Sequence, residues 1–331
     1  MRIPLGTLRI LVLLAVFVGT VLFFASQIDG YLNARLFNRI SGSVAVIALI
    51  AVGQAFVVLT RNIDLSIGSV VGCSAYFTGG ILIAYPDLPP ILVPLLAMGI
   101  GAVFGAFNGF LVARFRLPSI IVTLATLALF RSILVQSSDG SSITTNRLPT
   151  WLTEFATLNA FTAGELQFRW IVVISLIVVL TAHVFLTRFR AGRQFFAIGS
   201  NPDAAAFAGI NAGRTIFLAF VISGALAGLA GFMFLSRFGN ITVVAGLGLE
   251  LKSVGAVVVG GVNIFGGSGN VLGVLIGAAL IDLIDTSLVR WELVSAFWRE
   301  AVLGLLILLA VAADTVLMRR LLRRKPTGGS Q

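Results

Sequence analysis

Two aspartates, Asp282 and Asp285, stand three residues apart in an apolar run, a spacing that places both on one face of a helix. Paired acids of this kind suit general acid–base catalysis or cation binding. Metal sites of the commonest kinds add His or Cys ligands, and neither residue type lies beside this pair. We therefore predict no metal and no catalytic residue here, and we expect Asp285 to form an ion pair with Arg290. The alternative is a polytopic membrane enzyme, such as a lipid-linked transferase, with the two aspartates as its acids.

A second segment, "GLGLELKS" at residues 246–253, approaches the phosphate-binding pattern G-x-x-x-x-G-K-S. Leu251 stands where that pattern requires a glycine beside the lysine, and no strand signal precedes the segment. Because the phosphate loop depends on the backbone freedom of that glycine, we predict no nucleotide site and no cofactor in this chain. Any ATP-driven activity would need a separate hydrolase.

Three polar residues, Asn62, Asp64 and Ser66, lie at the junction of two apolar runs. An unpaired carboxylate in hydrocarbon would cost at least ~2.5 kcal/mol, so Asp64 must be paired, hydrated or capping a helix. Either Asp64 or Ser66 can cap the helix that follows. The alternative is that these residues line a solute pathway or a gate.

Further polar residues lie inside apolar runs. Asn108, Thr123 and Thr126 suit hydrogen bonds between helices, which contribute about 0.6–2 kcal/mol, or weak binding of a neutral polyol. Asn263 lies in "GGVNIFGGSGN", a segment so rich in glycine that it predicts a tight turn or irregular backbone at membrane depth. We count these four as pathway candidates too. Arg131 is expected to snorkel outward or to pair with a carboxylate.

The elements that hold these residues are membrane spans. The chain has 331 residues, of which 58% are hydrophobic and 11% charged, and its mean hydropathy is +1.05. Soluble domains carry roughly 25% charged residues. The sequence therefore predicts an all-α polytopic membrane helical bundle with a single transmembrane domain over residues 1–318 and a basic tail over 319–331. The basic residues behind the net charge of +10 cluster at the ends of apolar runs, which favours a lipid bilayer over nucleic acid as the partner.

About ten membrane spans are predicted from apolar runs that are separated by polar residues. The runs cover residues 7–27, 42–60, 67–85, 91–113, 119–136, 169–187, 214–236, 250–262, 271–289 and 300–318. An even number places both termini on one side of the membrane. With the N-terminus inside, basic residues divide fourteen inside to eight outside, with Arg131 left in a span. This bias predicts cytoplasmic N- and C-termini.

The same topology places residues 188–214 in the cytoplasm, and their local chemistry predicts a short helix. Ser200 or Asn201 can cap it, Pro202 fits the first helical position, Asp203 suits its positive end, and Gly209 suits a left-handed stop. The intervening "AAAFA" has little side-chain bulk, which lets another surface approach the backbone. Such a helix either docks into a cleft of a partner or lies on its own domain.

The segment "RAGRQFFAIGSNPDAAAFAGIN" resembles the cytoplasmic loop of permease subunits in ABC-type sugar importers, a binding-protein-dependent, branched-chain-type family that includes ribose transporters. The segments "VLTRNIDLSIGSVVG", "FNGFLVARFRLPSIIVTLATLALFRS" and "GLGLELKSVGAVVVGGVNIFGGSGNVLG" are similar to that family as well, in family order over roughly residues 45–315. Within the family, the chain most resembles permeases for autoinducer-2 and rhamnose.

This resemblance implies a type II importer fold of about ten spans in the bacterial inner membrane. It also implies three protein partners: a cytoplasmic ATPase, a periplasmic sugar-binding protein, and a second permease that is identical or different. The ATPase-coupling helix would comprise Ser200, Asn201, Pro202, Asp203, Ala204, Ala205, Ala206 and Gly209. The solute would be rhamnose, autoinducer-2 or a ribose-type sugar. An ion-coupled secondary transporter is a further alternative, although it would need buried titratable groups within its spans, and this chain has few of them.

Overall fold

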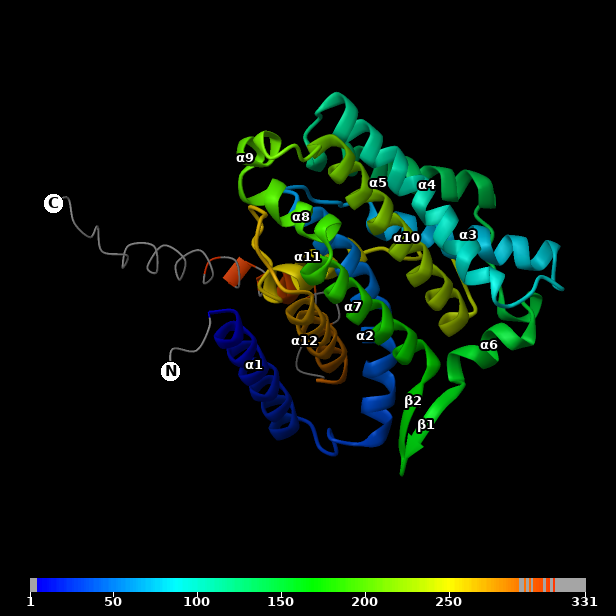
Figure 1. Cartoon of the computed structure of the whole chain (residues 1–331). Coiled ribbons are helices and arrows are strands. Elements are labelled where there is room, and N and C mark those ends of the chain that lie inside the picture. The colour runs from blue at the N-terminus through cyan, green and yellow to red at the C-terminus, as the bar shows by residue number, and fades with distance from the viewer. Residues whose placement is uncertain are drawn as a thin grey trace.

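The computed structural model describes residues 5–291, 295, 298, 300–305, 308–309 and 312 (Figure 1). Within them, eight helices are long and apolar enough to cross a membrane, and eighteen residues at 1.5 Å each already reach ~27 Å. These helices are α1 (Leu5–Gln27), α2 (Ala34–Leu59), α3 (Ile67–Ala84), α4 (Leu92–Phe115), α5 (Ser119–Ser138), α7 (Trp170–Arg188), α10 (Ala212–Phe238) and α12 (Val271–Arg290). The predicted polytopic helical bundle is confirmed.

Two of the ten predicted spans are not among these eight. The run at 300–318 lies largely outside the described residues, and the tail at 319–331 lies wholly outside them. The run at 250–262 contains α11 (Leu249–Val259), which has 11 residues and reaches only ~16 Å. As a single membrane-spanning helix, that prediction is wrong.

The bundle has two ends, which Figure 1 shows far apart. At one end, α9 (Pro202–Phe207) follows α8 (Arg190–Ser200), close to the ends of α2 and α11; we call this the α9 end. At the other, which we call the hairpin end, β1 (Asn159–Ala163) pairs antiparallel with β2 (Leu166–Arg169) beside the start of α2. The sequence did not predict this hairpin, nor the short helices η1 (Thr145–Arg147) and α6 (Thr150–Thr157) that precede it.

Residues 239–259 run from the hairpin end to the α9 end although α11 forms only half of the crossing. At the hairpin end, Ile241 pairs with Ile143 through backbone hydrogen bonds of 2.9 and 3.0 Å. Between there and α11, Arg131 Nη1 donates to the carbonyl oxygens of Val243 at 2.8 Å and Ala245 at 2.7 Å. We expected Arg131 to snorkel outward or to pair with a carboxylate, and the hydrogen bonds observed go to backbone carbonyls instead, with the charge of Glu250 acting from nearby. Its guanidinium satisfies carbonyls that no helix satisfies, a necessity at this depth.

Helices α4 and α10 pack closely where they cross, and α2 forms the buried centre of the bundle. A Cβ at Gly105 in α4 would lie 3.0 Å from the Cα of Gly224 in α10, so only glycines permit this approach. The segment "SGALAGLAG" (residues 223–231) has small residues four apart, and these residues form the packing face of α10. Nearly every side chain of α2 from Ala45 to Leu59 is buried, whereas most of α1 is accessible on the outside of the bundle.

Candidate functional site

The helix α9 has the capped form that its sequence predicts. The Asn201 side chain accepts a hydrogen bond from the backbone N–H of Ala204 at 3.0 Å, which makes Asn201 the N-cap. Pro202 takes the first helical position, and Gly209 follows with φ of +76°, in the left-handed region that favours glycine. Ser200, the other predicted cap, is instead the last residue of α8.

The outer face of α9 consists of small residues and one large ring. Asp203, Ala204 and Ala206 are exposed, while Ala205 is buried against the rest of the chain. Phe207 is 94% exposed, more than any other large hydrophobic side chain among the described residues. Our sequence reasoning missed Phe207, because a single phenylalanine in an alanine run reads as the residue that packs inward. Its position two residues after Ala205 places it on the other face.

A set of backbone contacts fixes α9 on the bundle. Arg61, just past α2, donates from Nε to the carbonyl oxygen of Gly199 at 2.6 Å and from Nη2 to that of Ser200 at 2.9 Å. We call this pair of bonds the Arg61 clamp. It satisfies carbonyls at the end of α8 with a cation, the charge that the negative end of a helix favours. The clamp therefore links the end of α2 directly to the residues that precede α9.

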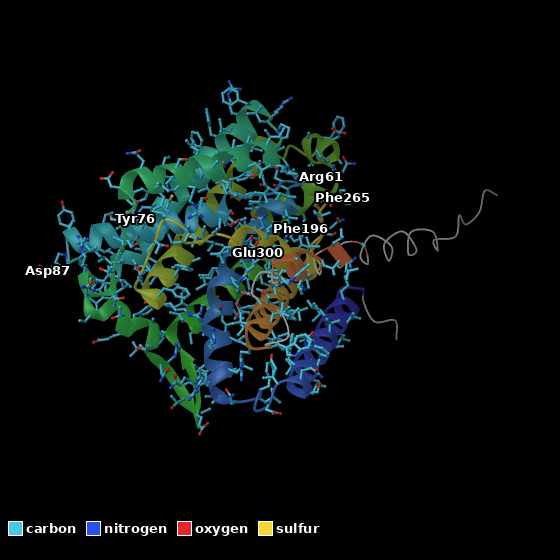
Figure 2. All side chains as sticks on the ribbon, turned by 180° about the vertical axis from the view of Figure 1, so that it is seen from behind. Arg61, Tyr76, Asp87, Phe196, Phe265 and Glu300 are labelled. Carbon is cyan, nitrogen blue, oxygen red and sulfur yellow. The ribbon has the colours of Figure 1, made fainter. Side chains whose placement is uncertain are left out.

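The glycine-rich segment 262–270 closes the same junction. Gly267 donates its N–H to the carbonyl of Leu59 at 3.1 Å and accepts from Ser200 Oγ at 3.0 Å. A side chain at Gly267, whose φ is +77°, would strike Ser200. Phe265 in this segment is 73% exposed, and the next residue, Gly266, lies against Arg61 (Figure 2 labels Phe265 and Arg61). The α9 end thus presents two exposed rings, Phe207 and Phe265, on elements that are bonded to one another.

Three predicted pathway residues form one buried cluster, which we call the Asp64 cluster. Asn108 Nδ2 donates to Ser66 Oγ at 2.7 Å, and Ser66 donates to Asp64 Oδ1 from its hydroxyl at 2.7 Å and its backbone at 3.0 Å. Ser66 stands directly before α3, which has no side-chain cap, so the predicted capping of this helix by Asp64 or Ser66 is wrong. Asp64 instead fixes Ser66, the residue from which α3 begins. Burial raises the pKa of Asp64 above its ordinary value, and the bonds from Ser66 act in the opposite direction.

The other four pathway candidates lie apart from that cluster's chain of bonds. Thr123 Oγ1 donates to the carbonyls of Ser119 and Ile63 and so ties α5 to the segment before α3. Thr126 bonds back within α5, to the carbonyl of Thr123. The side chains of Asn62 and Asn263 make local turns at the α9 end. A pathway role for these residues and for the Asp64 cluster stays a prediction.

A cavity of about 500 Å³ lies at the hairpin end, between α2, the end of α10, the irregular backbone before α11, and α12. Its volume falls in the range of sites that hold small ligands. Irregular backbone at membrane depth is tolerated where it lines such a cavity. The lining residues are Arg39, Ser43, Val46, Ile47, Phe234, Arg237, Phe238, Asn240, Thr242, Val244, Ala245, Gly246, Leu247, Leu249, Lys252, Asp282, Asp285, Thr286 and Val289. The predicted pathway residues are not among them.

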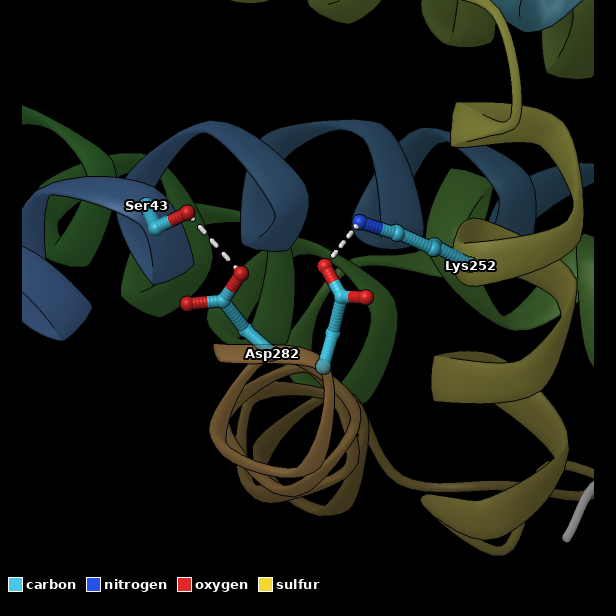
Figure 3. Close-up of polar contacts among 4 residues, drawn as sticks. Ser43, Lys252 and Asp282 are labelled. Carbon is cyan, nitrogen blue, oxygen red and sulfur yellow. Dashed lines mark hydrogen bonds and ion pairs between the residues drawn. The ribbon is translucent and has the colours of Figure 1, made fainter. Parts of the chain in front are cut away.

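The paired aspartates of α12 both line this cavity, with different partners (Figure 3). Asp285 Oδ2 accepts from Lys252 Nζ at 2.6 Å. The expected pair of Asp285 with Arg290 is therefore not the ion pair observed; the Arg290 guanidinium lies 5.6 Å from the ring centre of Tyr31. Sequence proximity suggested Arg290, but Lys252 approaches from a separate half-helix.

Asp282 is only half satisfied. Its Oδ1 accepts from Ser43 Oγ at 2.8 Å, whereas Oδ2 has no hydrogen-bond partner among the described residues. The side chain is 2% exposed, and an unsatisfied buried acceptor costs ~1–3 kcal/mol, more when it is charged. A group of this kind needs an explanation, and its position beside the cavity supplies a place for one.

Comparisons with known proteins agree on one family. Residues 36–311 match the family described as "Branched-chain amino acid transport system / permease component". The chain is 38% identical to the autoinducer 2 import system permease protein LsrC of Enterobacter sp., over 89% of this chain and 83% of the relative. It is 34% identical to LsrC of Salmonella paratyphi B (91% and 86%) and 35% identical to that of Escherichia coli O9:H4 (89% and 84%). No solved structure matches the chain.

Proposed function

The chain belongs to the branched-chain amino acid transport system / permease component family, and from this premise we propose that it is the permease subunit of an ATP-binding-cassette importer for a sugar-like solute. The relatives are named as permeases of autoinducer 2 import systems, so autoinducer 2 is the first solute to test, before rhamnose and ribose. The eight long apolar helices are what such a subunit needs to cross the bacterial inner membrane.

In this proposal the α9 end faces the cytoplasm. Basic residues favour the cytoplasmic side, and in the topology predicted from the sequence they divide fourteen to eight in its favour. Lys252, one of those eight, lies inside the bundle, which leaves seven on the opposite side. Both chain termini would then be cytoplasmic, while the β1–β2 hairpin and the cavity-lining residues Arg39 and Arg237 would lie toward the periplasmic side. A periplasmic binding protein would deliver the solute there.

The exposed side chain of Phe207 is the observation that supports docking of an ATPase at α9. A ring that is 94% exposed to water gains ~1.5–3 kcal/mol when a partner buries it fully. The small residues around it allow close approach, as in an anchor that enters a cleft. The Arg61 clamp would pass the movement of a docked α9 to the end of α2. ATP hydrolysis would belong to that partner, because Lys252, the lysine of the near-miss phosphate motif, is bonded to Asp285 inside the bundle.

A second permease would cover the open side of the cavity. Val244, Leu247 and Val289 line the cavity and are each about half exposed or more. Charged groups behind such a rim cannot face lipid chains without large cost, so a protein surface must close the cavity. That surface belongs either to a second copy of this chain or to a different permease.

The test is Phe207→Ala in the chain co-expressed with its candidate ATPase and binding protein. We expect at least tenfold weaker association with the ATPase and a matching loss of autoinducer 2 uptake, because the anchor is removed and the bundle is not. The matched control is Phe161→Ala, an exposed ring in β1 at the hairpin end. Copurification and uptake are measured for both. Wild-type association of the Phe207→Ala protein with the ATPase would contradict the docking role.

A further inference from the structure

We propose that the Oδ2 oxygen of Asp282 accepts a hydrogen bond from a hydroxyl group of the transported solute, which makes the cavity at the hairpin end a binding site for a neutral polyhydroxylated molecule. This inference rests on the proposed import function and adds the site and the chemistry of recognition. Neither the resemblance nor the named relatives assign a role to this aspartate.

The first observation is the contrast within one helix turn. Asp282 and Asp285 are both buried, and both line the cavity. Asp285 has its cation in Lys252, 2.6 Å away, while Asp282 has only the hydroxyl of Ser43 on one oxygen. The bond from Ser43 fixes the carboxylate, so that its second oxygen is held ready and unused. Nearly all buried polar groups in proteins have a hydrogen-bond partner. Because Asp282 also lines the cavity, a ligand that enters there and turns this carboxylate slightly would supply the missing donor.

The second observation is the position of the site along the bundle. Asp282 lies eight residues before the end of α12, about 12 Å from the hairpin end of that helix. Lys252 lies in the first turn of α11, the half-helix that begins inside the bundle. Broken helices that begin at membrane depth are where transporters place their solutes. The cavity lining therefore extends from Arg39 near the hairpin end to Lys252 inside the bundle.

The charges of the lining select a neutral solute. Arg39, Arg237 and Lys252 carry three positive charges against two on Asp282 and Asp285. A cation would be repelled by this surplus, and an anion would meet the free oxygen of Asp282. A hydroxyl group donates to Asp282 and accepts from a guanidinium of the same site. The apolar lining, including Ile47 and Phe234, suits the C–H faces of such a molecule.

The experiment uses the complete importer in proteoliposomes, with autoinducer 2 as the probe. Asp282→Asn keeps the size of the side chain and an oxygen for Ser43, but it puts an NH₂ donor in the place of the Oδ2 acceptor. We expect uptake to fall at least tenfold. Asp87→Asn, an exposed acid outside the site, is the matched control and should import at the wild-type rate.

A labelling measurement covers the case in which Asp282→Asn fails to assemble. Asn240 lines the cavity and is exposed, so Asn240→Cys in a Cys73→Ser background should react with a charged thiol reagent. With Asp282 intact, autoinducer 2 delivered by the binding protein should slow this reaction at least threefold. A reaction rate that the probe leaves unchanged would overturn the proposed site.

Two other outcomes would also overturn it. One is wild-type uptake by the Asp282→Asn importer. The other is uptake by the wild-type importer that stops when Na⁺ is replaced by choline, which would assign Asp282 to a cation. Failure of the proposed function has a different signature: the wild-type importer itself would neither bind an ATPase nor move the probe.

Discussion

The α9 end and the cavity at the hairpin end are opposite cases of incomplete burial. At the α9 end the polar backbone is satisfied internally by the Arg61 clamp and Gly267, and the group left over is an apolar ring, Phe207, in water. In the cavity the group left over is a carboxylate oxygen of Asp282. The exposed ring indicates a protein partner that would bury it, and the unsatisfied carboxylate oxygen indicates a ligand that would donate a hydrogen bond to it.

The largest effect is expected from a substitution that disrupts the packing of α4 against α10, on which both regions depend. Gly105→Leu would force α4 and α10 apart, because a Cβ there already meets the backbone of Gly224. We expect about 3 kcal/mol of destabilisation, seen as lost yield and a lower melting temperature in detergent. Gly99→Leu in the same helix is the control, since nothing lies within 4 Å of its Cβ position. Equal melting temperatures would contradict the packing account.

The second-largest effect concerns the ion pair between Lys252 and Asp285 in the cavity. Lys252→Met removes the ammonium group that pairs with Asp285. Because the two side chains are only 22% and 9% exposed, the loss of this partner should destabilise the folded protein by ~2 kcal/mol. Adding Asp285→Asn should restore part of that loss, because the carboxylate that Lys252 pairs with is then replaced by a neutral amide. Thermal unfolding of the two single variants and the double variant measures the coupling. Additive losses would show that this ion pair does not hold α11 to α12.

A smaller effect is expected from the clamp at the α9 end. Arg61→Ala removes two bonds to the end of α8 but leaves Phe207 in place, so we expect about fivefold weaker binding of the ATPase. Arg61→Lys should recover only part, because an ammonium cannot reproduce the fork of a guanidinium. Arg116→Ala, at the same end of the bundle, controls for loss of charge. Binding is measured by copurification over a range of ATPase concentrations.

The smallest effect tests the cap alone. Asn201→Ala should cost about 1 kcal/mol of local helix stability, and Asn201→Asp should cost much less because it retains the acceptor for Ala204. Amide hydrogen exchange of residues 203–208 would report this as faster exchange in the alanine variant alone. Equal exchange in both variants would mean that the Arg61 clamp, and not the cap, holds α9.

Local features of the fold could be predicted from sequence, and features that depend on distant partners could not. Asn201, Pro202 and Gly209 act on their own neighbours, so the position of α9 followed from their types. Phe207 was missed because its exposure depends on where Ala205 packs. The partner of Asp285 was wrong because Lys252 is 33 residues away. The irregular backbone at 239–248 could not be predicted from its own residues. Its carbonyl oxygens at Val243 and Ala245 receive their hydrogen bonds from Arg131, which lies in another helix.

The central claim is that Phe207 lies in the cytoplasm and is covered by an ATPase. Phe207→Cys in the Cys73→Ser background tests it most directly, by reaction with a membrane-impermeant thiol reagent. We predict no reaction in intact cells, reaction in opened cells that lack the ATPase, and protection in opened cells that contain it. Labelling of this cysteine from outside intact cells would contradict the account.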